Sequence, residues 1–403
     1  MIEGKIHQDF WPVARTFRNV LPRRGPGGAA LVVYHRGEKV VDVWAGTRDE
    51  EGNPWNPDTL SVSYSTTKGV VSTVLHMLVD RGLLDYDDPV ARHWPEFAEA
   101  DKQDITVRQL MCHEAGLYDI HSMIDHARRM LDWNHMVGAL AAARPCHPPG
   151  TAHGYHGFTY GWLIGEIIQR VTGKPLARVL EEEVANPLGL EGLFIGLPRE
   201  ARSRRAQLIM SGVQTSRQGT ERFRAQLARA AIVLGGLRVP FDPTQVTAAL
   251  MPPGIEDLDF NSEEFQSASI PAANGMFSAR SLGRLYAALA AGGEIDGVRL
   301  LSRRTLERAT KRQNKGIGRV IPFPMHWRLG YHRPFSLTGG IPSGFGHFGF
   351  GGSGAWADCR RNLSVALVLN SGVGTPFGDT RIVRVSTTAL RCAERRAPAL
   401  PYG

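Results

Sequence analysis

The spacing of apolar residues changes from helical to strand-like within the first fifty positions. Between residues 10 and 20, apolar side chains recur mostly at intervals of three or four, which places them on one face of a helix. These are Phe10, Trp11, Ala14, Phe17 and Val20. Residues 29–34 and 39–44 are runs rich in β-forming residues, separated by a polar tetrapeptide. The pattern therefore predicts an amphipathic helix followed by a β-hairpin.

A second helical pattern starts near residue 65, after a polar loop that contains proline. Gly82 is expected to end this helix, because glycine readily adopts the left-handed conformation found at helix C-termini. The side expected to be buried consists of Val70, Val71, Val74, Leu75 and Leu78.

Helical patterns and loops dominate residues 85–270, and strand-like sequence returns only near the end. The helical patterns lie at 107–112, 123–131, 160–171 and 223–233, the strand patterns at 327–331, 346–350, 354–358 and 363–370, and a final helical pattern at 380–394. We therefore predict an α/β (α+β) fold whose sheet combines residues 1–84 and 271–403, with an all-helical domain of residues 85–270 inserted between them. The segment 198–237, rich in arginine and alanine, is either a lid over the site or a solvated helical pair.

Composition narrows the functional classes. The chain has 403 residues, 42% of them hydrophobic and 21% charged, as in an ordinary globular protein. Its net charge of +8 comes from scattered basic residues, which favours a solvated surface over nucleic-acid binding. The four widely spaced cysteines indicate free thiols, with neither a zinc site nor a disulfide framework; they are Cys112, Cys146, Cys359 and Cys392. A polar N-terminus and the lack of a run of about 20 apolar residues predict a cytoplasmic protein without a membrane span, with peripheral membrane attachment left open.

Three segments carry candidate chemistry. In Ser65-Thr66-Thr67-Lys68 the hydroxyl and the amine are three residues apart, so on a helix Lys68 can reach Ser65 and take its proton if the amine is neutral. Tyr155 follows a Pro-Gly-Thr turn directly before a helix, where it could share that proton. In His347-Phe348-Gly349-Phe350 the glycine lets a substrate approach a strand edge that can supply a backbone N–H to an oxyanion.

In this order, the segments resemble the serine β-lactamase and penicillin-binding-protein superfamily, most closely the family VIII carboxylesterases of its class C-like branch. Segments 105–117, 186–190 and 274–278 agree, so the resemblance covers nearly the whole chain. It implies an antiparallel sheet flanked by helices, with the active site in the cleft beside the helical domain. It also implies that Ser65 is the acylated nucleophile, Lys68 its activator and Tyr155 the proton shuttle. The backbone N–H groups of Ser65 and Phe350 would form the oxyanion hole.

Two departures from the class C pattern favour esters as substrates. Class C lactamases carry Tyr-x-Asn and Lys-Thr-Gly, where this chain has Tyr155-His156-Gly157 and His347-Phe348-Gly349. The amide and the ammonium that hold a β-lactam are therefore missing, whereas a neutral ester loses little. We expect the substrate-binding residues to be His347, Gly349, Phe348, His156 and Trp327, within an apolar wall made by Phe345, Phe348, Phe350, Trp356 and Trp327.

Each candidate residue also has a structural interpretation. Ser65 could cap a helix, Lys68 could lie on the surface, and Tyr155 and His347 could be ordinary loop and strand-end residues. Ser353, in a Gly-Gly-Ser-Gly-Ala segment, lacks the following helix of a nucleophile elbow, and we interpret it as structural.

The favoured prediction is a serine carboxylesterase for short- to medium-chain esters. An acyltransferase, a β-lactamase, a D-amino-acid peptidase and a catalytically silent scaffold remain alternatives. We expect a small-molecule ester as partner, no nucleic acid, no cofactor and no metal; a homodimer stays open.

Overall fold

The computed structural model describes residues 1–22, 24–210, 221, 222, 225, 226, 229, 241–372 and 379–396. Most of the helix predicted at 223–233 and most of the predicted lid segment 198–237 lie outside these residues. From the beginning of that segment the structure gives the 3₁₀ helix η5 (Arg199–Arg204) and the strand β6 (Ile209–Met210).

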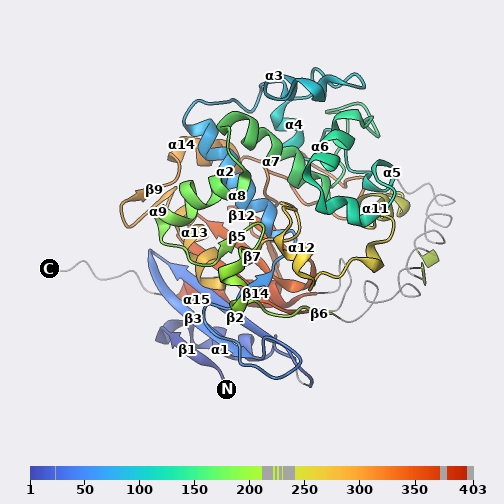
Figure 1. Ribbon diagram of the computed structural model, residues 1–403. Coiled ribbons are helices and arrows are strands. Elements are labelled where there is room, and N and C mark those ends of the chain that lie inside the picture. Colours follow the sequence, from blue (N-terminus) through green and yellow to red (C-terminus); the bar gives the residue numbers. More distant parts are fainter. Residues whose placement is uncertain are drawn as a thin grey trace.

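A six-stranded sheet in the order β1-β3-β2-β14-β13-β12 joins the two ends of the chain (Figure 1). All five strand pairs in it are antiparallel, and the N-terminal strand β2 (Gly28–His35) lies beside the C-terminal strand β14 (Leu363–Leu369) with Leu31 opposite Leu367. This arrangement confirms the predicted sheet. The other strands are β1 (Glu3–Ile6), β3 (Glu38–Gly46), β13 (Gly354–Asp358) and β12 (Gly344–Phe348).

Helices cover both faces of the sheet. Because successive strand residues point to opposite faces, Leu31 and Val33 join one apolar cluster and Val32 joins the other. The first cluster includes α1 (Trp11–Arg18) and α15 (Arg381–Arg395), and the second includes α2 (Thr66–Asp80) and α13 (Ala279–Ala290). Burial on both faces explains why residues 28–34 of β2 are apolar without alternation.

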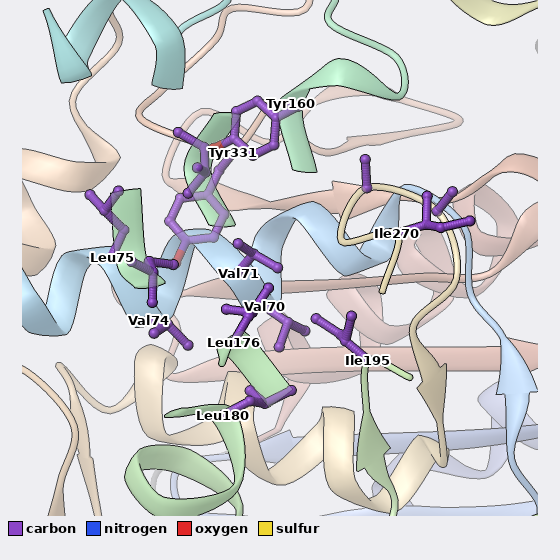
Figure 2. Packing of buried hydrophobic residues seen from close by; sticks show 14 of the residues in the cluster. Val70, Val71, Val74, Leu75, Tyr160, Leu176, Leu180, Ile195, Ile270 and Tyr331 are labelled. Carbon is purple, nitrogen blue, oxygen red and sulfur yellow. The ribbon is translucent and has the colours of Figure 1, made fainter. Parts of the chain in front are cut away.

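The helix α2 passes through the interior of the protein. Val70, Val71, Val74 and Leu75 pack with residues of α7 (Thr159–Thr172) and α8 (Leu176–Leu180), as Figure 2 shows. The predicted buried side is confirmed, but every residue from 66 to 79 is buried, including Lys68. Gly82 follows the helix with φ +70°, as expected of a helix stop.

The predicted hairpin is confirmed, whereas the strand predicted at 327–331 is wrong. The hairpin turns at Arg36 and Gly37, whose φ angles of 55° and 78° are those of a tight turn between twisted strands. In the second case Gly330 has φ +72° and donates its N–H to the Met111 carbonyl, 2.9 Å away. The segment therefore turns across α2. The Gly330 N–H, which would bond to a neighbouring strand in a sheet, instead bonds to Met111 in the helical region.

The chain between the two parts of the sheet is mostly helical. Within residues 85–270, two-residue strands also occur: β5 (Leu193–Phe194) pairs with β7 (Met276–Phe277), which pairs on its other side with β4 (Ser61–Val62). The domain boundaries at 84 and 271 stay predictions. The helices here are α3 (Val90–His93), η2 (Pro95–Ala98), α4 (Val107–Met111), α5 (Ile120–Met123), η3 (Ala127–Leu131), α6 (Trp133–Ala142), η4 (Glu181–Ala185), α9 (Asn186–Leu188), α11 (Thr244–Leu250), η7 (Ile255–Asp257) and α12 (Glu263–Ser267).

The remaining elements are short, apart from α14. They are η1 (Gln8–Phe10), β8 (Glu294–Ile295), β9 (Val298–Arg299), α14 (Arg303–Thr310), β10 (Phe335–Ser336), β11 (Gly339–Gly340), η8 (Phe350–Gly352) and β15 (Ser371–Gly372). All four cysteines are free thiols, as predicted. Among the helices of the described residues, none has both the length and the apolar character needed to cross a bilayer.

Candidate active site

Ser65 lies where a constrained loop becomes the helix α2. It is the N-cap of that helix, and the preceding Tyr64 has φ 45°, an unusual value for a residue with a side chain. The Thr67 hydroxyl donates to the Tyr64 carbonyl at 2.5 Å and accepts the Gly275 N–H at 3.0 Å. The backbone that presents Ser65 is therefore held from two sides, so the strained conformation at Tyr64 is maintained by its surroundings.

Lys68 lies one turn into α2 and is fully buried. Its Nζ is 3.0 Å from Ser65 Oγ, 2.6 Å from the Gly157 carbonyl oxygen and 3.0 Å from the Ala272 carbonyl oxygen. Burial lowers the pKa of Lys68 well below its ordinary value, because the ammonium form loses its hydration. The interpretation of Lys68 as a surface lysine is therefore wrong.

Tyr155 comes from the loop before α7 and completes the contacts of Ser65. Its hydroxyl donates to Ser65 Oγ at 2.7 Å. The Tyr155 ring is stacked on Trp327, with centroids 5.3 Å apart and planes at 6°, and Lys68 Nζ lies 5.0 Å from the ring centroid. Burial raises the pKa of Tyr155 well above its ordinary value. The phenol is therefore protonated at neutral pH and can serve as a hydrogen-bond donor.

The end of β12 approaches the nucleophile closely because Gly349 has no side chain. A Cβ there would lie 2.4 Å from the Ser63 carbonyl oxygen. Buried His347 stacks on Tyr155 at 6.1 Å, its Nδ1 is 3.0 Å from the Phe348 carbonyl oxygen, and its Nε2 has no hydrogen-bond partner in the described part of the chain. Burial lowers the pKa of His347 well below its ordinary value, because the charged form loses its hydration. His347 is therefore neutral.

A cavity of about 550 Å³ opens onto Ser65 and Tyr155. Of the predicted substrate-binding and oxyanion residues, Trp327, His347, Phe348, Gly349 and Phe350 line it. Sequence reasoning missed the others, most of them apolar: Leu250, Ile321, Phe323, Pro324, Met325, His332, Arg333, Phe335, Asp379, Thr380, Ile382 and Val383. Such a lining suits the acyl or alcohol part of an apolar substrate.

Three predicted wall or binding residues lie outside the cavity lining. His156 Nε2 accepts the Leu117 N–H at 3.0 Å, and its Nδ1 is 3.3 Å from Nδ1 of His113, so it braces the loop of Tyr155. Phe345 is buried against Tyr331. Trp356 lies opposite Gly346 in the sheet register and donates its Nε1–H to Ser386 Oγ of α15 at 2.9 Å, on the opposite face of the sheet. The expected contribution of Phe345 and Trp356 to the wall is therefore wrong.

Ser353 has a structural environment. It is buried, and its Oγ accepts the Leu369 N–H at 3.3 Å within the sheet. This setting agrees with its interpretation as a structural serine.

An ion pair at the start of α15 holds the loop after Phe350. Arg381 Nε bonds both Asp379 oxygens at 3.0 Å, and its Nη2 donates to the Gly351 carbonyl at 2.7 Å. Gly351 has φ +79°, so the turn that carries the Phe350 amide has a conformation suited to glycine. Within the described ranges, no cluster of histidine, cysteine, aspartate and glutamate side chains could hold a metal ion.

Comparison with known proteins identifies the family. A family model described as Beta-lactamase matches residues 13–389. The chain belongs to the beta-lactamase family. Among relatives of this beta-lactamase-family chain is "Esterase/beta-lactamase LipL" of Mycobacterium tuberculosis (strain ATCC 25618 / H37Rv), 39% identical over 91% of this chain and 82% of that protein.

Solved structures extend the likeness to the whole fold. A penicillin-binding protein homologue from Caulobacter crescentus has a TM-score of 0.84 and 35% identity, covering 97% of this chain and 100% of that one. A family VIII carboxylesterase has a TM-score of 0.83 and 33% identity, again covering 97% and 100%. The resemblance seen in the sequence motifs is thereby confirmed for family and fold.

Proposed function

We propose that this serine hydrolase is a carboxylesterase that cleaves short- to medium-chain esters through an acyl-enzyme on Ser65. One observation carries the proposal: Ser65 Oγ lies 3.0 Å from Lys68 Nζ and 2.7 Å from the Tyr155 hydroxyl at an apolar cavity. The likeness to a family VIII carboxylesterase supports the reaction class.

The hydrogen bonds of Lys68 fit a neutral amine that acts as the base. A neutral amine has two N–H groups and one lone pair. The carbonyls of Gly157 and Ala272 can accept the two N–H groups, which leaves the lone pair for the Ser65 hydroxyl proton. Since burial favours this neutral form, Lys68 can take the proton as Ser65 Oγ attacks the ester carbonyl.

Tyr155 would return the proton to the departing alcohol. After attack, Lys68 carries the proton and the tetrahedral intermediate carries the negative charge. The Tyr155 O–H, already donating to Ser65 Oγ, gives its proton to the alkoxide as the C–O bond breaks and regains one from Lys68. Water then attacks the acyl-enzyme, with the same groups taking its proton, and releases the acid and free Ser65.

The negative oxygen of the intermediate would be held by the backbone N–H groups of Ser65 and Phe350. Both residues line the cavity, and the T-shaped contact of Tyr64 with Phe350 at 5.2 Å ties the two segments together. Among the described residues, neutral His347 has an Nε2 without a hydrogen-bond partner, so it could accept a hydrogen bond from the hydroxyl of the released alcohol. It provides no positive charge for an anionic substrate, which favours neutral esters.

A second candidate is hydrolysis of anionic acyl compounds such as β-lactams. The observation that favours it is Arg333, a cation in the cavity lining that the sequence did not reveal. If Arg333 binds a lactam carboxylate, Arg333→Gln should lower nitrocefin turnover and leave p-nitrophenyl butyrate turnover nearly unchanged.

Ester turnover in matched serine variants tests the proposal. Ser65→Ala should reduce kcat for p-nitrophenyl butyrate by at least about 10³, because the covalent route is lost. Ser353→Ala, a change of the same size at a buried serine outside the cavity lining, should keep kcat within about threefold. Ester turnover that survives Ser65→Ala would overturn the assignment, and nitrocefin turnover that exceeds ester turnover would favour the second candidate.

A further inference from the structure

The outer surface of α1 and α15 carries a group of exposed arginines without ion pairs. In the described part of the chain, none of the five has a salt-bridge partner. They are Arg15 and Arg18 of α1, and Arg384, Arg391 and Arg395 of α15. We call the exposed surface of these two helices the α1–α15 face.

The arginines form a continuous surface because the two helices lie side by side. The hydroxyls of Thr16 and Thr388 are 2.8 Å apart, and Figure 1 shows both helices at the lower end of the molecule, away from α3. At about 100° per residue, Arg384, Arg391 and Arg395 fall within an arc of roughly 40° around α15. They therefore make a single row along the helix.

Carboxylates at the edge of this face are paired with other arginines. Asp9 and Glu38 bind Arg396, and Glu394 binds Arg361. These acidic groups therefore do not neutralise the row on α15. The face presents a net positive charge to solvent.

Large apolar side chains stand among these charges. Trp11, at the start of α1, is 62% exposed, whereas the other seven tryptophans are buried or half-buried. Leu337, at the turn between β10 and β11, is 64% exposed, and its N–H donates to Thr387 Oγ1 of α15 at 2.8 Å. The hairpin is thus fixed against the edge of the same face.

The active-site cavity adjoins this edge. Phe335 of β10 and Ile382 and Val383 of α15 line the cavity, and Arg384 is the next residue along the helix. A flat anionic surface that contacts Leu337 and the arginine row would therefore lie close to these lining residues.

We propose that the α1–α15 face docks onto the surface of an anionic lipid bilayer. Arginines supply the attraction to lipid phosphates, while tryptophan and leucine enter the interfacial region, where such side chains are favoured. A nucleic acid would use the arginines but would leave Trp11 and Leu337 without a role. The proposal goes beyond the esterase assignment and does not depend on it.

Vesicle cosedimentation of the full chain tests this docking. The protein should bind phosphatidylcholine vesicles that contain phosphatidylglycerol and bind pure phosphatidylcholine weakly, and raising salt from about 0.1 M to about 0.5 M should release it. Arg384→Glu/Arg391→Glu should weaken binding by at least about 30-fold, because each arginine contributes roughly a factor of five and each glutamate adds repulsion. Arg303→Glu/Arg304→Glu on α14 makes the same charge change away from the face and should alter binding less than about threefold.

Trp11 gives a second, site-specific measurement. Vesicles with brominated acyl chains should quench part of the tryptophan fluorescence in the wild type, and Trp11→Phe should abolish that quenching. Soluble p-nitrophenyl butyrate turnover should be the same in all these variants, which separates docking from catalysis. Equal loss of binding in the α14 control would overturn the proposal. So would the absence of quenching, or binding of duplex DNA through the same arginines without binding of vesicles.

Discussion

Replacing Lys68 by methionine removes the proposed base while keeping a long side chain in the same buried site. Loss of a positioned proton acceptor lowers the rate by about 10²–10⁴, or roughly 3–5 kcal/mol of barrier. The carbonyls of Gly157 and Ala272 also lose their 2.6 Å and 3.0 Å contacts with Nζ. Each such loss costs about 1–3 kcal/mol of folding free energy, offset in part because an amine is no longer buried. We therefore expect a large loss of activity with a moderate loss of stability.

Lys68→Arg is the matched control for charge. It keeps N–H donors but stays protonated, so it should be as inactive as Lys68→Met. Steady-state kcat/KM for p-nitrophenyl butyrate should be measured from about pH 5 to pH 10, with urea unfolding to confirm that each variant is folded. In the wild type the rate should rise with pH as Lys68 loses its proton, and this rise should lie well below pH 10 because burial lowers the pKa of Lys68.

Two results would refute this reasoning. One is a folded Lys68→Met variant that keeps more than about a tenth of the wild-type kcat/KM, since removal of a general base costs at least about 10². The other is a folded Lys68→Arg variant that is active with an unchanged pH profile.

Three further predictions follow from the surroundings of the site. Gly349→Ala should lower kcat, because the new Cβ would lie 2.4 Å from the Ser63 carbonyl oxygen. The expected fall is about 10-fold or more, up to the 10²–10³ that follows the loss of an oxyanion donor. The control Gly138→Ala, which has open space around the new Cβ, should leave kcat unchanged. Arg381→Lys cannot keep all the contacts to Asp379 and the Gly351 carbonyl, so kcat should fall by about 10-fold while KM changes less. A rise in KM as large as the fall in kcat would contradict a positioning role. Burial lowers the pKa of His76 to about 3 and of His332 to about 4, so between pH 6.5 and those values the unfolded chain binds protons that the folded chain does not. Urea unfolding should therefore show a stability at least about 3–4 kcal/mol lower at pH 5 than at pH 7, since other buried histidines act in the same direction. Equal stabilities at the two pH values would contradict this.

The sequence was most informative where local patterns decide the structure. The hairpin of residues 28–46 follows from two apolar runs around a turn with glycine, and α2 follows from its apolar spacing and Gly82. Ser65 and Lys68 meet because they are one helical turn apart, and the 3.0 Å contact needs no long-range information.

Features that depend on tertiary packing could not be predicted in the same way. The acceptors of Lys68 at Gly157 and Ala272 are backbone carbonyls, which carry no side-chain signal in the sequence. Trp356 looked like a wall residue because it is aromatic and near the motif, but strand register directs it to the other face. The residues of segment 327–331 favour a strand by local propensity. In the structure Gly330, with φ +72°, turns the segment across α2, so tertiary contacts outweigh that propensity.

The central claim is that Ser65 is the nucleophile. A fluorophosphonate probe reacts with activated serine hydroxyls, and mass spectrometry of the digested protein identifies the labelled peptide. The account predicts one label on the peptide that contains Ser65, retained in Ser353→Ala and lost in Ser65→Ala. Labelling that persists in folded Ser65→Ala, or that maps to Ser353 in the wild type, would contradict it.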